Sequence, residues 1–134
     1  MGFSYYRTVR LSDTDAAGVI FFPRLLSICH EAYEEALLSV RIDLKTFFRD
    51  STSAIPIVQA NISFFRPIFA GDRLLVNLEP KLLKDSEFEI VYSILLARAN
   101  RECAAKAITR HVCIDPNSRT RIKLPTAIAN WIEI

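Results

Sequence analysis

The pattern of apolar and polar positions predicts one long helix between residues 24 and 40. Apolar side chains recur there at steps of three and four residues, the spacing that places them on one helix face. They are Leu25, Cys29, Ala32, Ala36 and Val40, with Leu26, Tyr33 and Leu37 widening the stripe. The acidic residues Glu31, Glu34 and Glu35 fall on the opposite side. So broad a stripe indicates a helix that is largely wrapped by the rest of the protein.

Most of the remaining chain has the β-branched and aromatic residues that are typical of strands. We expect strands at 3–11, 54–65, 73–83, 87–98 and 103–115, a short helix at 44–48, and a tail at 124–134 that can form a helix. Short turns join the last three strands, so these neighbours are antiparallel. Ala105, Ala107 and Thr109 share one face of the last strand, where a helix can approach closely. One helix cannot form a bundle, so the sequence predicts an α+β domain with the helix packed on the sheet.

Composition narrows the class of protein. The chain has 134 residues, 51% of them hydrophobic, which suits a single domain over 1–134 with a real core. A net charge of +2 argues against a nucleic-acid partner. Basic residues are nevertheless frequent from Arg98 to Lys123, where they can meet an anionic ligand or simply lie on solvated strand faces.

The same composition predicts a cytoplasmic protein without a membrane partner. No apolar run approaches the length of about 18 residues that a membrane span needs, and the first residues lack the apolar region of a signal peptide. Cys29, Cys103 and Cys113 are odd in number and sit in apolar contexts, as reduced thiols of a cytosolic protein do.

Several kinds of catalytic site are excluded by missing motifs. The sequence has no glycine-rich phosphate loop, no GxSxG elbow, no HExxH and no paired CxxC. With only His30 and His111, a histidine-rich metal site is excluded. A hydrolytic site built on a carboxylate needs no metal, and we expect no cofactor. Cys29 and His30 are adjacent, but sequential residues on a helix do not face each other, so they do not form a nucleophile–base pair.

The remaining candidate chemistry lies in the loop Ser12–Gly18, which carries Asp13 and Asp15 just before the long helix. Loop aspartates commonly do no more than cap turns or helices, and that interpretation stays open. The free N–H groups of a helix start can, however, stabilise a developing oxyanion. A carboxylate that faces such donors across a substrate carbonyl can attack it or activate water.

The run from Asp13 to Pro23 resembles the signature of the 4-hydroxybenzoyl-CoA thioesterase group of hotdog proteins. That pattern is acid, any residue, acid, two small residues, Gly, two apolar residues and two aromatics, often followed by Pro or a small polar residue. The resemblance implies that Asp15 is the catalytic carboxylate and that the backbone N–H of Phe22 polarises the thioester carbonyl. Phe65-Arg66-Pro67, followed by Gly71-Asp72, resembles a strand–turn signature of the same family.

The resemblance also implies a fold, a substrate class and an assembly. The fold would be a hotdog, a five-stranded antiparallel sheet wrapped around one long helix, and the ligand an acyl-CoA. Active sites of this family lie between subunits, so the chain is expected to be a homo-oligomer, a dimer of dimers.

The sequence departs from the commonest bacterial branch, which has His where Phe22 stands. It is more similar to the cyanobacterial branch that hydrolyses 1,4-dihydroxy-2-naphthoyl-CoA in phylloquinone synthesis, on segments 29–34, 55–58 and 111–114. The substrate-binding residues implied are Gly18, Phe21, His30, Val58 and Gln59. His30 can bond a ring hydroxyl of the acyl group or be a structural histidine, whereas the strand residue His111 is expected to be structural.

Three other functions remain as alternatives: a thioesterase of other acyl specificity, a dehydratase acting on acyl thioesters, and a non-catalytic acyl-CoA-binding protein. A dehydratase needs a positioned histidine with an acid on a helix, and it would leave the Asp15 loop unexplained. Release of free thiol from aromatic acyl-CoA substrates separates an enzyme from a binding protein.

Overall fold

The computed structural model describes residues 2–49, 52–98 and 100–134. The elements follow in the order β1 (Phe3–Thr8), a single 3-10 turn η1 (Leu11–Asp13), α1 (Phe22–Ser39), α2 (Leu44–Phe47), β2 (Ile57–Phe64), β3 (Arg73–Lys84), β4 (Glu87–Leu96), β5 (Cys103–Val112) and α3 (Thr126–Glu133). The expected order of one strand, one long helix and four strands is confirmed.

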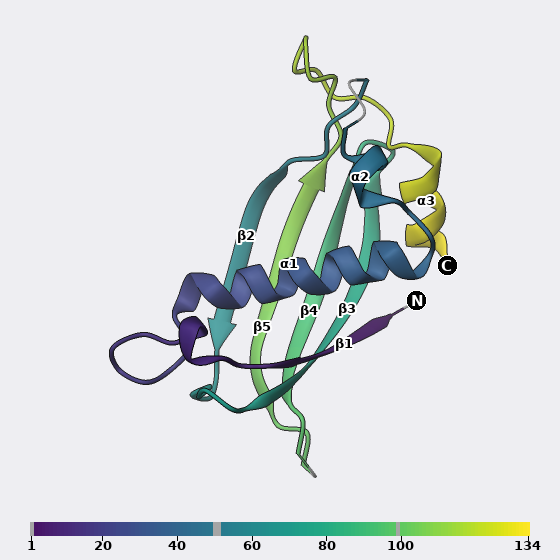
Figure 1. Cartoon of the computed structure of the whole chain (residues 1–134). Coiled ribbons are helices and arrows are strands. Elements are labelled where there is room, and N and C mark those ends of the chain that lie inside the picture. Colours follow the sequence, from purple (N-terminus) through teal and green to yellow (C-terminus); the bar gives the residue numbers. More distant parts are fainter. Residues whose placement is uncertain (1, 50–51, 99) are drawn as a thin grey trace.

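The five strands form one antiparallel sheet in the order β1-β3-β4-β5-β2. β1 therefore lies at one edge of the sheet. β2 is the next strand along the chain, but it lies at the opposite edge. The chain must cross the sheet between them, and α1 makes this crossing over one sheet face (Figure 1). The loop between β1 and α1 lies at one end of the helix, and both chain termini lie near the other end (Figure 1). The α+β class and the antiparallel sheet packed against a long helix are confirmed.

The core lies between α1 and the sheet. Leu25, Cys29, Ala32 and Ala36 are fully buried, as the helical pattern predicts, and Ile28 joins them. On the facing strand β5, Ala105 and Ala107 are buried, so small side chains lie under the helix as expected. α3 adds Ile128, Trp131 and Ile132 to the same core, so the predicted tail is a packed helix.

Prolines account for two of the differences between the predicted and the observed starts of helices and strands. α1 begins at Phe22, two residues before the predicted start, with Pro23 in its first turn. Proline fits there because the first turn uses no intrahelical N–H bonds. β2 begins at Ile57, directly after Pro56, which has no N–H for a strand ladder. Ala54, within the predicted strand, forms only an isolated bridge with Ile114.

β2 is unusually open for a strand. Every residue of Ile57–Phe64 is exposed except the half-buried Ile62, although the strand carries apolar side chains at Ile57, Val58 and Phe64. Such an edge strand presents unpaired backbone groups as well as apolar surface. Among the described residues, no helix is both long and apolar enough to cross a membrane.

Candidate active site

The loop that carries Asp15 is a tight turn closed by its own backbone. The Gly18 N–H donates to the Asp15 carbonyl at 3.0 Å, and the Asp15 N–H donates to the Val19 carbonyl at 2.8 Å. Gly18 has a φ of 85°, a left-handed conformation that side-chain-bearing residues rarely adopt. The Ala17 N–H also donates to Asp15 Oδ1 at 2.8 Å. Gly18 therefore contributes to the site through the turn that it permits.

The start of α1 supplies the backbone donor expected at Phe22. Phe21 is the extended N-cap, with φ −68° and ψ 122°, and Phe22 is the first helical residue. In this position the N–H has no acceptor within the helix and points out of the helix end. Pro23, the next residue, has no N–H, so Phe22 provides a donor at this point without a competing neighbour.

Asp15 and Phe22 line the same cavity, which has a volume of about 420 Å³. Its other walls come from the residues after the turn (Val19 and Ile20) and from the end of β2 and the segment that follows it (Phe64, Phe65, Arg66, Pro67 and Ile68). The walls are mostly apolar, while the carboxylate and the helix start provide polar groups. A thioester carbonyl fits this arrangement because it needs an electrophilic donor and a base or nucleophile together.

Arg66 and the aromatic pair Phe64 and Phe65 were not among the predicted site residues, although they line the cavity. Arg66 is half-exposed and pairs with Glu102 at 2.9 Å. The Phe65-Arg66-Pro67 signature was the available signal, but sequence alone does not show that this segment faces Asp15.

His30 lies at a second cavity, of about 290 Å³, between α1 and the β2–β5 side of the sheet. This second cavity is lined by Leu26, Ser27, His30, Ile57, Ala60, Tyr92 and Thr109. His30 is exposed, and its Nδ1 lies 3.6 Å from Glu34 Oε2. The cavity thus combines apolar walls with three side-chain hydroxyl groups and one imidazole.

The remaining predicted binding residues are not assembled around Asp15 within one chain. Phe21 is half-exposed beside Phe22, with ring centroids 5.6 Å apart. Val58 is exposed on the edge strand β2. Gln59 lines a cavity together with Asn61, Glu89, Ile108 and Arg110. This cavity lies on the sheet face opposite Ala60 and α1, because alternate strand residues point to opposite faces. Neither Val58 nor Gln59 lines the Asp15 cavity or the second cavity.

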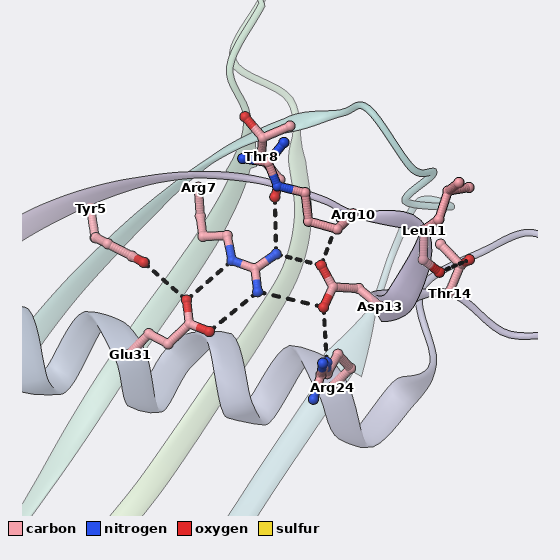
Figure 2. A network of polar contacts seen from close by, with 9 residues as sticks. All are labelled: Tyr5, Arg7, Thr8, Arg10, Leu11, Asp13, Thr14, Arg24 and Glu31. Carbon is pink, nitrogen blue, oxygen red and sulfur yellow. Dashed lines mark hydrogen bonds and ion pairs between the residues drawn. The ribbon is translucent and has the colours of Figure 1, made fainter.

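A buried network holds the residue two positions before Asp15. The Asp13 side chain is 1% exposed and accepts hydrogen bonds from Arg7, Arg24 and the Arg10 N–H (Figure 2). Arg7 also donates to Glu31. The helical pattern placed Glu31 free on the solvent side of the helix, and this prediction is wrong. Burial would raise the pKa of Asp13, but the bonds from Arg7, Arg10 and Arg24 outweigh it and lower the pKa to about 2.

Cys29 and His111 are buried away from solvent. Cys29 is fully buried, and burial raises the pKa of its thiol to about 12, so the thiolate needed for attack does not form. His111 is also fully buried and bonds Thr109 Oγ1 through Nε2 at 2.8 Å, as a structural histidine would. All three cysteines are free thiols. Across the described residues, no group of three or more His, Cys, Asp or Glu side chains is placed to hold a metal ion.

Comparisons with a family model, with related sequences and with solved structures show the family of this chain. Residues 9–132 match the model of the thioesterase-like superfamily. The 1,4-dihydroxy-2-naphthoyl-CoA hydrolase of Gloeothece citriformis is 56% identical over 128 residues, 96% of this chain and 90% of the relative. That of Rippkaea orientalis is 54% identical over 129 residues, 96% and 94% of the two chains.

A solved structure has the same fold. It is the crystal structure of a 1,4-dihydroxy-2-naphthoyl-CoA thioesterase from Synechocystis, with a TM-score of 0.94 and 40% identity. The match covers 98% of this chain and 96% of the Synechocystis chain. The chain therefore belongs to the thioesterase-like superfamily of hotdog proteins, in the family that contains these 1,4-dihydroxy-2-naphthoyl-CoA hydrolases.

Proposed function

We propose that this chain is a thioesterase that hydrolyses 1,4-dihydroxy-2-naphthoyl-CoA to the free acid and CoA, using Asp15 and the backbone N–H of Phe22. The observation that carries the proposal is the single apolar cavity lined by both residues. The relatives at more than half identity over nearly the whole chain carry the name of this activity, which supports the choice of substrate.

The mechanism needs a polarised carbonyl and an oxygen nucleophile. The Phe22 N–H, at the positive end of the α1 dipole, donates to the thioester oxygen and stabilises the negative charge that develops on it. The Asp15 carboxylate takes a proton from water, whose oxygen then bonds the carbonyl carbon, or attacks that carbon itself to form an anhydride that water opens. In both routes the carbon–sulfur bond breaks, and the CoA thiolate leaves and takes up a proton.

The two routes differ in where the solvent oxygen goes. A single turnover in water labelled with ¹⁸O, with enzyme in excess, puts the label in the naphthoate product if Asp15 is a base. If Asp15 is the nucleophile and water opens the anhydride at the enzyme carboxyl carbon, the label appears on the Asp15 side chain. Label on Asp15 therefore demonstrates the anhydride, whereas label in the product alone is expected from a base or from opening at the naphthoyl carbon.

The proposed acyl site extends from the Asp15 cavity toward His30. Phe22 and Leu26 are one turn apart on α1, as are Leu26 and His30, so the two cavities follow one edge of the helix. A flat bicyclic acyl group suits the apolar part of this path. The imidazole of His30 and the hydroxyl groups of Tyr92 and Thr109 are candidates to bond the ring hydroxyls.

We propose that the active unit is a homo-oligomer, a dimer of dimers, in the cytoplasm. The open edge strand β2, with its exposed Ile57, Val58 and Phe64, is the surface that supports pairing with a second copy. In such an assembly the Val58 and Gln59 of one subunit are proposed to contribute to the site of the other. The free thiols support a reducing compartment.

The proposal is tested by thiol release from a panel of CoA thioesters with 1,4-dihydroxy-2-naphthoyl, naphthoyl, 4-hydroxybenzoyl and medium-chain aliphatic acyl groups. We expect the highest kcat/KM for the dihydroxynaphthoyl thioester. A medium-chain substrate that exceeds every aromatic one would refute the proposed substrate, while the thioesterase activity would stand. An absence of thiol release from the whole panel would refute the enzyme and favour an acyl-CoA-binding protein.

A further inference from the structure

Asp13 is a buried carboxylate for which the proposed chemistry has no direct use. Its side chain is 1% exposed, whereas Asp15, two residues later, is exposed at the cavity. A buried carboxylate is costly unless it is paired and hydrogen-bonded. The bonds that Asp13 makes must therefore offset the cost of burying its charge.

The partners of Asp13 come from both elements that flank the catalytic loop. Arg7 of β1 bonds Asp13 Oδ2 through Nη1 and reaches Oδ1 through Nη2 at 3.4 Å. Arg24 of α1 donates from Nε to Oδ1 at 2.8 Å, and the Arg10 N–H donates to Oδ2 at 2.8 Å. The carboxylate thus ties the end of β1 to the first turn of α1 (Figure 2).

Arg7 extends the network to the third turn of the helix. Its Nε donates to Glu31 Oε1 at 3.1 Å and its Nη2 donates to Glu31 Oε2 at 3.2 Å. The Tyr5 hydroxyl donates to Glu31 Oε1 at 2.9 Å. Charges alternate along the row Glu31, Arg7, Asp13, Arg24, so each ion is neutralised by a neighbour (Figure 2).

The backbone of Asp13 fixes the helix start as well. Its carbonyl oxygen accepts the Phe21 N–H at 2.8 Å, directly before the Phe22 donor. An isolated bridge pairs Thr14 with Ile20 across the same loop. Asp13 therefore contacts both the loop that carries the Asp15 carboxylate and the helix start that carries the Phe22 N–H.

We propose that Asp13, clamped by Arg7 and Arg24, is the positioning residue that sets the Asp15 carboxylate against the Phe22 N–H. This inference rests on the proposed thioesterase function. Asp13 does not touch the substrate and acts only through the geometry of the Asp15 carboxylate and the Phe22 N–H. A displacement of about 1 Å between reacting groups can cost roughly a hundredfold in rate.

The experiment is a double-mutant cycle on thiol release from 1,4-dihydroxy-2-naphthoyl-CoA, with Asp13→Asn, Asp15→Asn and the double variant. Asp13→Asn keeps the side-chain shape but removes the charge that both arginines need. We expect kcat to fall by about ten- to a hundredfold with KM within about threefold of the wild type, because positioning affects the chemical step. In the Asp15→Asn background the same change should cost less than about threefold, because the group that it positions is already gone.

Glu87→Gln is the matched control. Glu87 is another buried carboxylate held by two arginines, Arg110 and Arg121, at the far end of the sheet at the start of β4. Its replacement should lower thermal stability without changing kcat. If Asp13→Asn lowers kcat no more than Glu87→Gln does, or if its effect is fully additive with Asp15→Asn, the positioning role is refuted.

Arg24 provides a second variant should Asp13→Asn fail to fold. The Arg24 side chain is 45% exposed, so its replacement disturbs the core less. Arg24→Met should lower kcat severalfold at unchanged KM, and Arg24→Lys should restore part of the loss. Equal kcat values in Arg24→Met and the wild type would overturn the inference. Wild-type activity in Asp15→Asn would instead refute the proposed role of Asp15, and an absence of thiol release by the wild type would refute the proposed function, so these failures are distinct from that of the positioning role.

Discussion

The imidazole of His111 lies flat against the ring of Phe88, with ring centroids 4.6 Å apart and planes 9° from parallel. Tyr33 of α1 closes the same cluster, with its ring centroid 5.0 Å from that of His111. Burial, and to a smaller extent the nearby His30, lowers the pKa of His111 from 6.5 to about 4. The folded protein therefore keeps this histidine neutral well below the pH at which the unfolded chain protonates it.

This difference predicts a pH-dependent stability. Below pH 6.5 His111 is protonated in the unfolded chain, whereas in the folded protein it is protonated only below about pH 4. The free energy of unfolding therefore decreases as the pH falls from 6.5 to 4. Between pH 7.5 and pH 5 the contribution of His111 is a loss of about 2 kcal/mol. His111→Gln, which can keep the bond to Thr109, should lack this loss.

Urea unfolding of the wild type and of His111→Gln at pH 7.5 and pH 5 measures this loss of stability. Every other titrating group is shared, so the difference between the two pH dependences isolates His111. Equal losses in the wild type and in His111→Gln would show that the histidine is protonated in the folded protein.

Phe22→Pro tests the backbone donor directly. Proline suits the first helical position, and Phe21 already has the extended conformation that a residue before proline adopts. The substitution removes the N–H together with the aromatic ring, so Phe22→Leu, which removes the ring alone, is the control. We expect kcat of Phe22→Pro to lie about 10² to 10³ below that of Phe22→Leu, the usual cost of a lost oxyanion donor. Similar kcat values in the two variants would rule out the Phe22 N–H as that donor.

The helix start could be predicted to within two residues because the signals are local. A turn-forming loop, a proline and an apolar stripe follow one another within residues 12–40, so Asp15 and Phe22 could be placed near the same end of the helix. The antiparallel pairing of β3 with β4 and of β4 with β5 could be predicted for the same reason, because short turns join these strands.

The Arg7–Asp13–Arg24–Glu31 network could not be predicted from such local patterns. Glu31 looks like a solvent-side residue on the helical pattern, and only the docking of β1 beside α1 brings Arg7 to it. One signal was available: Phe3, Tyr5 and Arg7 alternate on a strand, so Arg7 shares the inward face with two aromatics. The outward position of Gln59 likewise depends on the register of β2, which begins only at Ile57.

His30→Ala tests how the ring hydroxyls are recognised. His30 lines the second cavity with the hydroxyl-bearing residues Tyr92 and Thr109. A polar group left unpaired when the hydroxyl is missing costs about 1–3 kcal/mol, so His30 should favour the hydroxylated substrate by about tenfold to a hundredfold. His30→Ala should therefore erode the ratio of kcat/KM between dihydroxynaphthoyl-CoA and plain naphthoyl-CoA. If both substrates lose equally, His30 has a structural role.

The assembly prediction concerns β2. We expect light scattering at micromolar concentration to give at least twice the monomer mass of 15.3 kDa. Val58→Asp should shift the protein toward the monomer and abolish thiol release, because an unpaired charge on an apolar interface is strongly unfavourable. Lys45→Asp, a change at another exposed position, on α2, should do neither. A wild-type protein that is monomeric and fully active would contradict the proposed shared site.

The most direct test is the turnover of 1,4-dihydroxy-2-naphthoyl-CoA by Asp15→Asn beside the wild type and Asp43→Asn, the same change at the exposed N-cap of α2. The amide is nearly the same size as the carboxylate but can act neither as a base nor as a nucleophile. We predict that kcat falls by about 10² to 10⁴ in Asp15→Asn, with the acyl-CoA still bound, and stays unchanged in Asp43→Asn. Turnover by Asp15→Asn within about threefold of the wild type would contradict the central role of Asp15.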